Sequence, residues 1–173
     1  MSKIYQPPES PFAPLYIDCL NNALMRQNLN FTTSSTSLVT VKDIPLIANL
    51  FDIDGKRLSA EVEGFLDSAG ASDGLQFGVS FDSVAQFAVT ITTVRDLGSY
   101  LAKLKAFRVG ANLRILLYVE SEPTQTTQNN AQLSGNYITI TPNFAIAHTL
   151  TLTARVVTGT SVLTAQGCSV SVL

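Results

Sequence analysis

The chain has 173 residues, a length that suits one domain able to bury about 70% of its unfolded surface. Hydrophobic residues make up 46% of the sequence and charged residues only 14%, so Thr, Ser, Asn and Gln must supply much of the polar surface. A net charge of -2 with scattered Lys and Arg gives no basic field for nucleic acid. The sequence has neither an apolar run of about 18 residues nor a signal-peptide core. We therefore expect no nucleic acid, no membrane, and synthesis in the cytoplasm.

Residues 1–35 differ from the rest and are expected to form an N-terminal arm, followed by a β domain at 36–173. The arm contains four prolines within eight positions: Pro7, Pro8, Pro11 and Pro14. Prolines at this density hold the backbone extended or in polyproline II. The next apolar residues recur at helical spacing and predict a short helix over Leu15–Gln27, after which Thr32–Ser37 is a polar linker. The apolar stripe of this helix suits packing on its own domain or docking, with the arm, on a neighbouring subunit.

From Ser37 onward apolar and polar residues alternate, the period of strands with one buried face. Strands are expected at 37–41, 58–67, 75–82, 87–92, 100–109, 113–119, 137–141 and, as a closing hairpin, at 149–156 and 162–173. The segment Tyr100–Val109 also suits a helix, and we favour the strand. In the last strand the apolar face shifts at Gly167, as a β-bulge would cause. These short strands, expected to pair antiparallel, predict an all-β sandwich, a jelly roll or a related Greek-key fold.

An uninterrupted apolar run, Ile115–Val119, indicates a strand covered on both faces. In a two-sheet sandwich only one face of a strand meets the core, so the run is expected to contact a partner subunit with the other. The residues expected at this interface are Ile115, Leu117, Tyr118 and Val119. The following segment, Glu120–Ser134, is rich in Gln, Thr and Asn and is expected to be a long exposed loop.

Residues that carry catalysis or bind metals are few. The one histidine, His148, has no serine and acid placed beside it for a triad, which favours a structural role. Cys19 and Cys168 cannot fill a closed zinc site with one histidine and are expected to be free thiols. Glu61 and Glu63 lie on the same face of one strand. Two such carboxylates are more often part of a solvated surface than the catalytic pair of a glycosidase. We expect no enzyme activity, no catalytic residue, no cofactor and no metal.

One acidic segment matches part of a calcium-binding loop. Asp52, Asp54, Gly55 and Glu61 have the spacing of calcium ligands, but the first acidic position falls on Leu50 and the flanks read as strands. A turn at 52–55 is therefore favoured.

Several segments of the β domain follow one another in a recognisable order: Ile44-Pro45, LSAEVEGFLDSAG, LQFGVSF, YLAKLKAFRVG, and the closing TLTLTARVV with TGTSVLTAQG. In this order they resemble the TNF-like jelly-roll domains of tailed-bacteriophage structural proteins, over residues 35–173. The resemblance implies a trimer that serves as a capsid decoration (cement) protein or as a head-fibre or tail-tip module. It includes no fixed site motif, so it assigns no functional residue.

Composition and resemblance lead to one hypothesis, a homotrimeric decoration protein on the capsid surface of the virion, bound to the major capsid protein. Its arm would contact capsid subunits or neighbouring trimers through Tyr5, Pro7, Pro8, Phe12, Leu15 and Tyr16. The alternative is a receptor-binding module of a tail or head fibre, with Glu120–Ser134 contacting a host glycan or protein. A third possibility is a carbohydrate-active or cupin-like enzyme, against which stands the lack of a ligand cluster.

Overall fold

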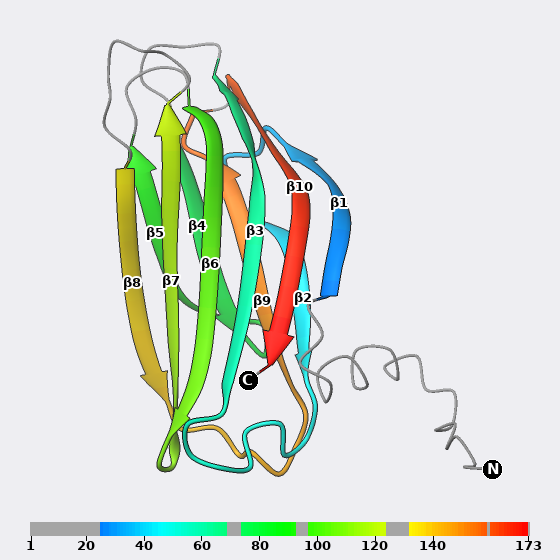
Figure 1. Ribbon diagram of the computed structural model, residues 1–173. Helices are drawn as coiled ribbons and strands as arrows, with labels where there is room; N and C mark the ends of the chain where they lie inside the picture. Colours follow the sequence, from blue (N-terminus) through cyan, green and yellow to red (C-terminus); the bar gives the residue numbers. More distant parts are fainter. Residues whose placement is uncertain (1–24, 69–73, 93–96, 124–131, 159, 173) are drawn as a thin grey trace, which may run out of the picture.

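The structure is a computed structural model that describes residues 25–68, 74–92, 97–123, 132–158 and 160–172 (Figure 1). These residues form ten β-strands and no helix. The described residues therefore contain no helix that could span a membrane. The strands are β1 (Met25–Thr33), β2 (Val39–Leu46), β3 (Arg57–Ser68), β4 (Gly74–Phe81), β5 (Val84–Thr92), β6 (Leu97–Val109), β7 (Asn112–Pro123), β8 (Gln132–Ile140), β9 (His148–Val156) and β10 (Ser161–Val172).

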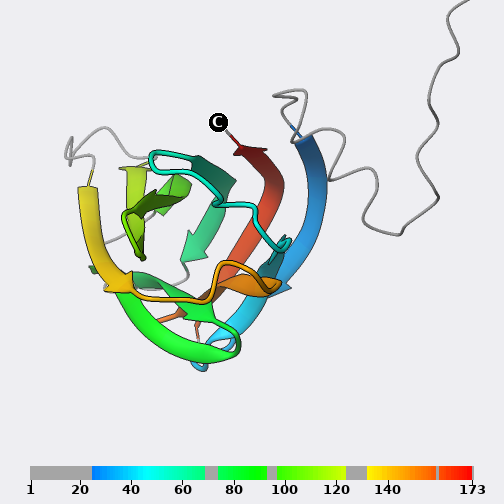
Figure 2. The ribbon, with the colours of Figure 1, turned by 90° about the horizontal axis from the view of Figure 1, so that it is seen from below.

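The strands form two antiparallel sheets that pack as a sandwich. The six-stranded sheet has the order β1-β10-β3-β6-β7-β8, and the four-stranded sheet has the order β2-β9-β4-β5. The chain alternates between the sheets from β1 to β4 and again from β8 to β10, which is jelly-roll connectivity. The paired strands β7 and β8 extend the larger sheet, so that β8 lies beside β5 of the smaller one. Figure 2 shows the two layers curving around a common interior.

The interior is filled by the inward side chains of both sheets, as alternation along the strands requires. The largest fully buried side chains are Phe77, Ile44, Leu58, Leu75, Ile91, Leu104, Leu113, Ile115, Leu117, Leu150, Leu152 and Leu163. Burial of each contributes about 1.5–3 kcal/mol of transfer free energy. The core is therefore continuous across both sheets.

One close approach inside the core requires a glycine. Gly64 of β3 lies opposite Tyr100 of β6, and a β-carbon at Gly64 would collide with the Thr164 carbonyl oxygen and with the Tyr100 hydroxyl group. The Tyr100 hydroxyl donates to that oxygen at 3.0 Å, and its ring packs on Phe77 with 5.2 Å between centroids. Burial raises the pKa of Tyr100, which keeps the hydroxyl protonated as a donor.

The predicted all-β sandwich is confirmed, as is the strand at Tyr100–Val109 (within β6). The predicted closing hairpin is wrong: its two strands exist as β9 and β10, but β9 pairs with β2 and β4 in the smaller sheet and β10 pairs with β1 and β3 in the larger one. The connection between them crosses from one sheet to the other, because the apolar side of each strand faces the common core. The register of β10 against β3 shifts between Ala165 and Gly167, where the bulge was expected. The segment 52–55 is a turn, in which Asp52 pairs with Lys56 at 3.1 Å.

The N-terminal part differs from the sequence prediction. Residues 15–24 of the predicted helix lie outside the described residues, and its last three, Met25–Gln27, belong to β1. Because β1 pairs with β10, the sandwich includes residues 25–33, which the sequence assigns to the arm and linker. The physical reason is that β10 offers an open backbone edge while Leu29 and Phe31 pack against the core.

Candidate functional site

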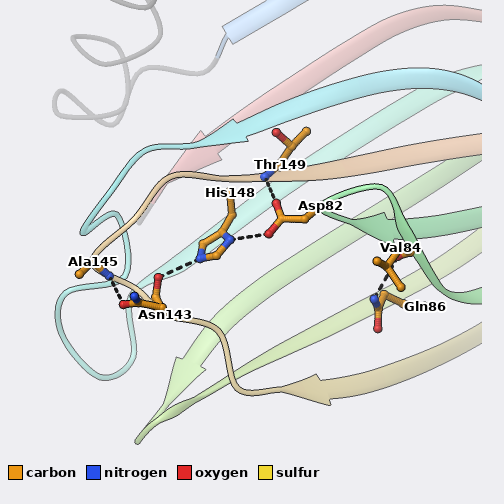
Figure 3. Close-up of polar contacts among 7 residues, drawn as sticks. All are labelled: Asp82, Val84, Gln86, Asn143, Ala145, His148 and Thr149. Atoms are coloured by element: carbon orange, nitrogen blue, oxygen red, sulfur yellow. Dashed lines mark hydrogen bonds and ion pairs between the residues drawn. The ribbon is translucent and has the colours of Figure 1, made fainter.

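The single histidine lies in a polar cluster at one end of the sandwich (Figure 3). His148 begins β9, and its Nδ1 lies 2.6 Å from Oδ2 of Asp82 in the turn between β4 and β5. Its Nε2 lies 2.8 Å from the backbone oxygen of Asn143. The second carboxylate oxygen of Asp82 accepts the Thr149 N–H at 2.8 Å. The cluster therefore joins the loop before β9 to the β4–β5 turn.

This geometry supports a structural role for the histidine. Its side chain is 9% exposed and packs on Phe81, with 4.8 Å between ring centroids, while both ring nitrogens have partners within the chain. Burial raises the pKa of Asp82, but hydrogen bonds from Thr149 and His148 outweigh burial, so this pKa lies below its usual value. The carboxylate is thus ionised and holds the turn in place.

Of the other candidates for chemistry, Glu61, Glu63 and Cys168 line one hollow of about 170 Å³ along β3 and β10. No group of three or more His, Cys, Asp or Glu side chains within the described ranges is placed to hold a metal ion. Cys168 is a buried free thiol whose pKa is raised by burial, and Cys19 lies outside the described residues. Glu61 and Glu63 point outward from β3, as expected for a solvated face.

The residues expected at a subunit interface divide between the two faces of β7. Ile115, Leu117 and Val119 are 0% exposed and point into the sandwich, whereas Leu116 and Tyr118 point outward. This corrects the expected placement of Ile115, Leu117 and Val119. They belong to the core of their own chain because alternation along β7 turns every second side chain inward. A homotrimer stays a prediction, and Tyr118 alone of the four residues is on the surface.

The surface that carries Tyr118 is the outward side of β3, β6, β7 and β8, which faces the reader in Figure 1 without a described element over it. We call it the outer face. It comprises Arg57, Ser59, Glu61, Glu63, Phe65, Asp67, Ser99, Leu101, Lys103, Lys105, Phe107, Arg114, Leu116, Tyr118, Glu120, Leu133, Gly135, Tyr137 and Thr139. Its exposed apolar side chains include Phe65 at 48%, Leu133 at 69% and Tyr137 at 64%.

Cations and aromatic rings pack together on one part of this face. Arg114 of β7 lies between the rings of Phe107 on β6 and Tyr137 on β8, 5.9 and 6.0 Å from their centroids. Lys105 and Lys103 lie 5.3 and 5.6 Å from the centroid of Tyr118. Such contacts orient long side chains that would otherwise be free in solvent.

Charges of opposite sign are separated along the strands of the outer face. The basic end carries Arg57, Lys105 and Arg114, and the acidic end carries Glu63, Asp67 and Glu120. Between them, Glu61 lies opposite Lys103, which pairs with Glu120 at 3.5 Å. Within the described part of the chain, Lys105, Arg114 and Glu63 form no ion pair.

A shallow hollow of about 440 Å³ lies at the acidic end. Phe65 and Leu101 supply its apolar lining, and Glu63, Glu120 and Gln166 supply its polar lining. The hollow is thus part of the outer face, next to the bulge of β10.

Sequence reasoning did not single out Phe65, Leu133 or Tyr137 as surface residues for binding. The available signal was a large apolar residue on the polar side of a strand, since Phe65 alternates with the core residue Leu66. Two predicted sites cannot be placed. The arm residues Tyr5, Pro7, Pro8, Phe12, Leu15 and Tyr16 lie outside the described residues. So does the middle of the predicted loop, 124–131, whose flanks belong to β7 and β8.

No protein-family model and no curated protein matches the sequence. Among solved structures, the chain is similar to the lectin UEA-II complexed with galactose (11% identity, 88% of this chain and 93% of that chain, TM-score 0.35). It is also similar to lectin II from Ulex europaeus (11% identity, 86% and 92%, TM-score 0.31). A third likeness is the CBM2 module of Lactobacillus casei BL23 phage J-1 evolved Dit (11% identity, 73% and 67%, TM-score 0.29). These scores are low, so the likenesses carry no argument about function.

Proposed function

We propose that the chain is a structural protein of a bacteriophage virion, a homotrimeric decoration (cement) protein that binds the major capsid protein on the capsid surface. The observation that supports this proposal most is the outer face, a broad sheet surface on which Phe65, Leu133 and Tyr137 are exposed. These three side chains lie on a sheet face that no described element covers, together with the exposed charged side chains Lys105, Arg114 and Glu63. A surface of this kind suits a protein that acts by contact.

The proposed mechanism is mechanical. The sandwich supplies a rigid body, and its end loops are fastened by side chains such as Arg108, which donates to the backbone oxygens of Phe51 and Asp52 at 2.7 and 2.8 Å. Each contact with the shell would contribute modest binding free energy. Linking several such contacts in one oligomer raises the effective concentration of the remaining ones, so the assembly binds more tightly than any single contact.

Two measurements test the proposal. Light scattering on the purified chain should give the mass of a trimer or of a whole number of trimers, and a monomer at micromolar concentration would overturn the oligomer. Quantitative mass spectrometry of purified particles should give a simple whole-number ratio to the major capsid protein. A count restricted to a vertex or a tail would contradict a decoration role and favour the receptor-binding module.

The arm is tested by removing residues 1–24, a deletion that keeps β1. We expect the truncated chain to keep its unfolding midpoint and to lose binding to particles that lack the protein. Unchanged particle binding would remove the arm from the proposal.

A further inference from the structure

The distribution of charge on the outer face makes this surface complementary to itself. The basic end and the acidic end lie on the same strands, four residues apart between Lys105 and Leu101 on β6. At about 3.3 Å per residue this spacing is about 13 Å, too far for Lys105 to pair with Glu63 or Glu120 of its own chain. A second copy, turned end for end, would bring these groups together.

We propose that the outer face binds the outer face of a second copy of this chain about a twofold axis. The axis would lie between the two faces, across the strands, at the level of Lys103 and Tyr118. Rotation about it places each strand antiparallel to its counterpart and puts the basic end of one copy over the acidic end of the other. Such an interface is isologous, because each contact occurs twice.

The register of the sheet specifies which residues then meet. Lys105 faces the Leu101 position of the other copy, where Glu63 and Glu120 lie on either side. On β8, Tyr137 faces Leu133, so that the two most exposed apolar side chains of the outer face cover each other. On β6 and β8 the register therefore pairs groups of suitable chemistry, whereas on β7 Leu116 faces Glu120.

Two further positions fit the same arrangement. Arg57 on β3 faces Phe65, an exposed ring with which a guanidinium group interacts favourably. Lys103, near the axis, would meet its own counterpart, but it already pairs with Glu120 and lies opposite Glu61. The middle of the interface therefore accumulates neither sign of charge.

The size of the face is sufficient for a specific contact. The four strands of the outer face span about 19 Å, and nine residues along a strand span about 30 Å. The product, roughly 570 Å² for each partner or about 1,100 Å² in total, is at the lower end of the range for specific interfaces. Two twisted sheets pack face to face with a small angle between their strands, as in sandwiches.

The inference goes beyond the proposed function, because it needs neither a virion nor a threefold axis. The contact turns a monomer into a dimer, and in a trimer each of the three outer faces can join a protomer of another trimer. It also assigns Tyr118 to a twofold contact and leaves the threefold contacts of a trimer to other surfaces.

The test uses two charge-reversing variants and their mixture, followed by sedimentation velocity of the full chain at low salt. Lys105→Glu places a third carboxylate beside Glu63 and Glu120 of the other copy, and Glu63→Lys places a second cation beside Lys105. Each variant alone should self-associate at least about tenfold more weakly than the parent chain, because like charges then face each other twice. An equimolar mixture should recover pairing, since each copy then faces the opposite sign. Added salt should weaken pairing of the parent chain.

Lys56→Glu is the matched control, because it makes the same charge change in the loop before β3, outside the outer face. It should leave pairing unchanged. Circular dichroism and urea midpoints should show that all variants fold. The proposal is overturned if the single variants pair as the parent does, if their mixture pairs no better than either alone, or if Lys56→Glu has the same effect. A chain that pairs in this way but never forms trimers would contradict the proposed function and leave this inference standing.

Discussion

Substitutions at two neighbouring positions of β7 provide the sharpest test of the fold. Leu117 is 0% exposed, and Leu117→Ala removes three carbon groups worth about 0.8 kcal/mol each, about 2.4 kcal/mol of transfer free energy. A cavity that relaxes only in part adds about 1 kcal/mol, which gives a loss of about 3–4 kcal/mol. Leu116→Ala, on the outer face, should cost less than about 1 kcal/mol.

The assay is equilibrium unfolding in urea followed by circular dichroism. With a slope of about 2 kcal/mol per molar urea, Leu117→Ala should lower the midpoint by about 1.5–2 M. Both substitutions are made in the Lys105→Glu background, so that pairing of the outer face does not stabilise either protein. Equal losses at the two positions, or a larger loss at Leu116, would mean that β7 is shifted by one residue and that its faces are exchanged.

Three further predictions concern single groups. Tyr100→Phe should lower the free energy of unfolding by about 1 kcal/mol, because the partly buried carbonyl oxygen of Thr164 loses the hydrogen bond from the tyrosine hydroxyl; an unchanged urea midpoint would contradict that hydrogen bond. The pKa of Asp82 is lowered in the folded state, so its stabilising contribution is complete above the usual value of 3.8 and is lost as the pH falls through the lower folded-state pKa. Asp82→Asn should therefore reduce the dependence of the urea midpoint on pH below about pH 4, and an identical pH profile would refute the role of this carboxylate. In a Cys19→Ser background, Cys168 should react with a thiol reagent only on unfolding, since burial raises its pKa; rapid reaction of the native protein would contradict its placement.

The alternation of apolar and polar residues was enough to predict the sandwich, because one face of each strand meets the core. The pairs Leu152 and Thr153 or Leu58 and Ser59 show this pattern directly. The bulge near Gly167 could also be predicted, since a shift of one residue in the apolar face has few other causes in a strand.

The strand β1 could not be predicted in the same way. Its sequence, MRQNLNFTT, has only Leu29 and Phe31 as packed apolar side chains in its second half, and its main stabilisation is backbone pairing with β10. That partner lies at the other end of the sequence, so no local pattern reveals it. The short helix was favoured there because local apolar spacing was the only signal available.

The outer face was also beyond local patterns. The apolar run at 115–119 suggests a strand that is covered on both faces. Which of its side chains meet the core follows from the register of β7 with its neighbours β6 and β8, and a local pattern does not contain that register. The separation of charge depends on register, which places Lys105 beside Leu116 and Leu101 beside Glu120. The basic and acidic ends of the outer face are therefore defined only once the pairing of β3, β6 and β7 is known.

The position of β10 has a consequence for synthesis. β10 lies between β1 and β3, so β1 has no neighbour in its sheet until β10 has been synthesised. Until then the edges of β1 and β3 that pair with β10 have no partner, and pairing between such distant segments is slow. A nascent polypeptide of this topology is therefore most vulnerable to aggregation before β10 has been synthesised, and chaperones that cover strand edges should have their greatest effect at that stage.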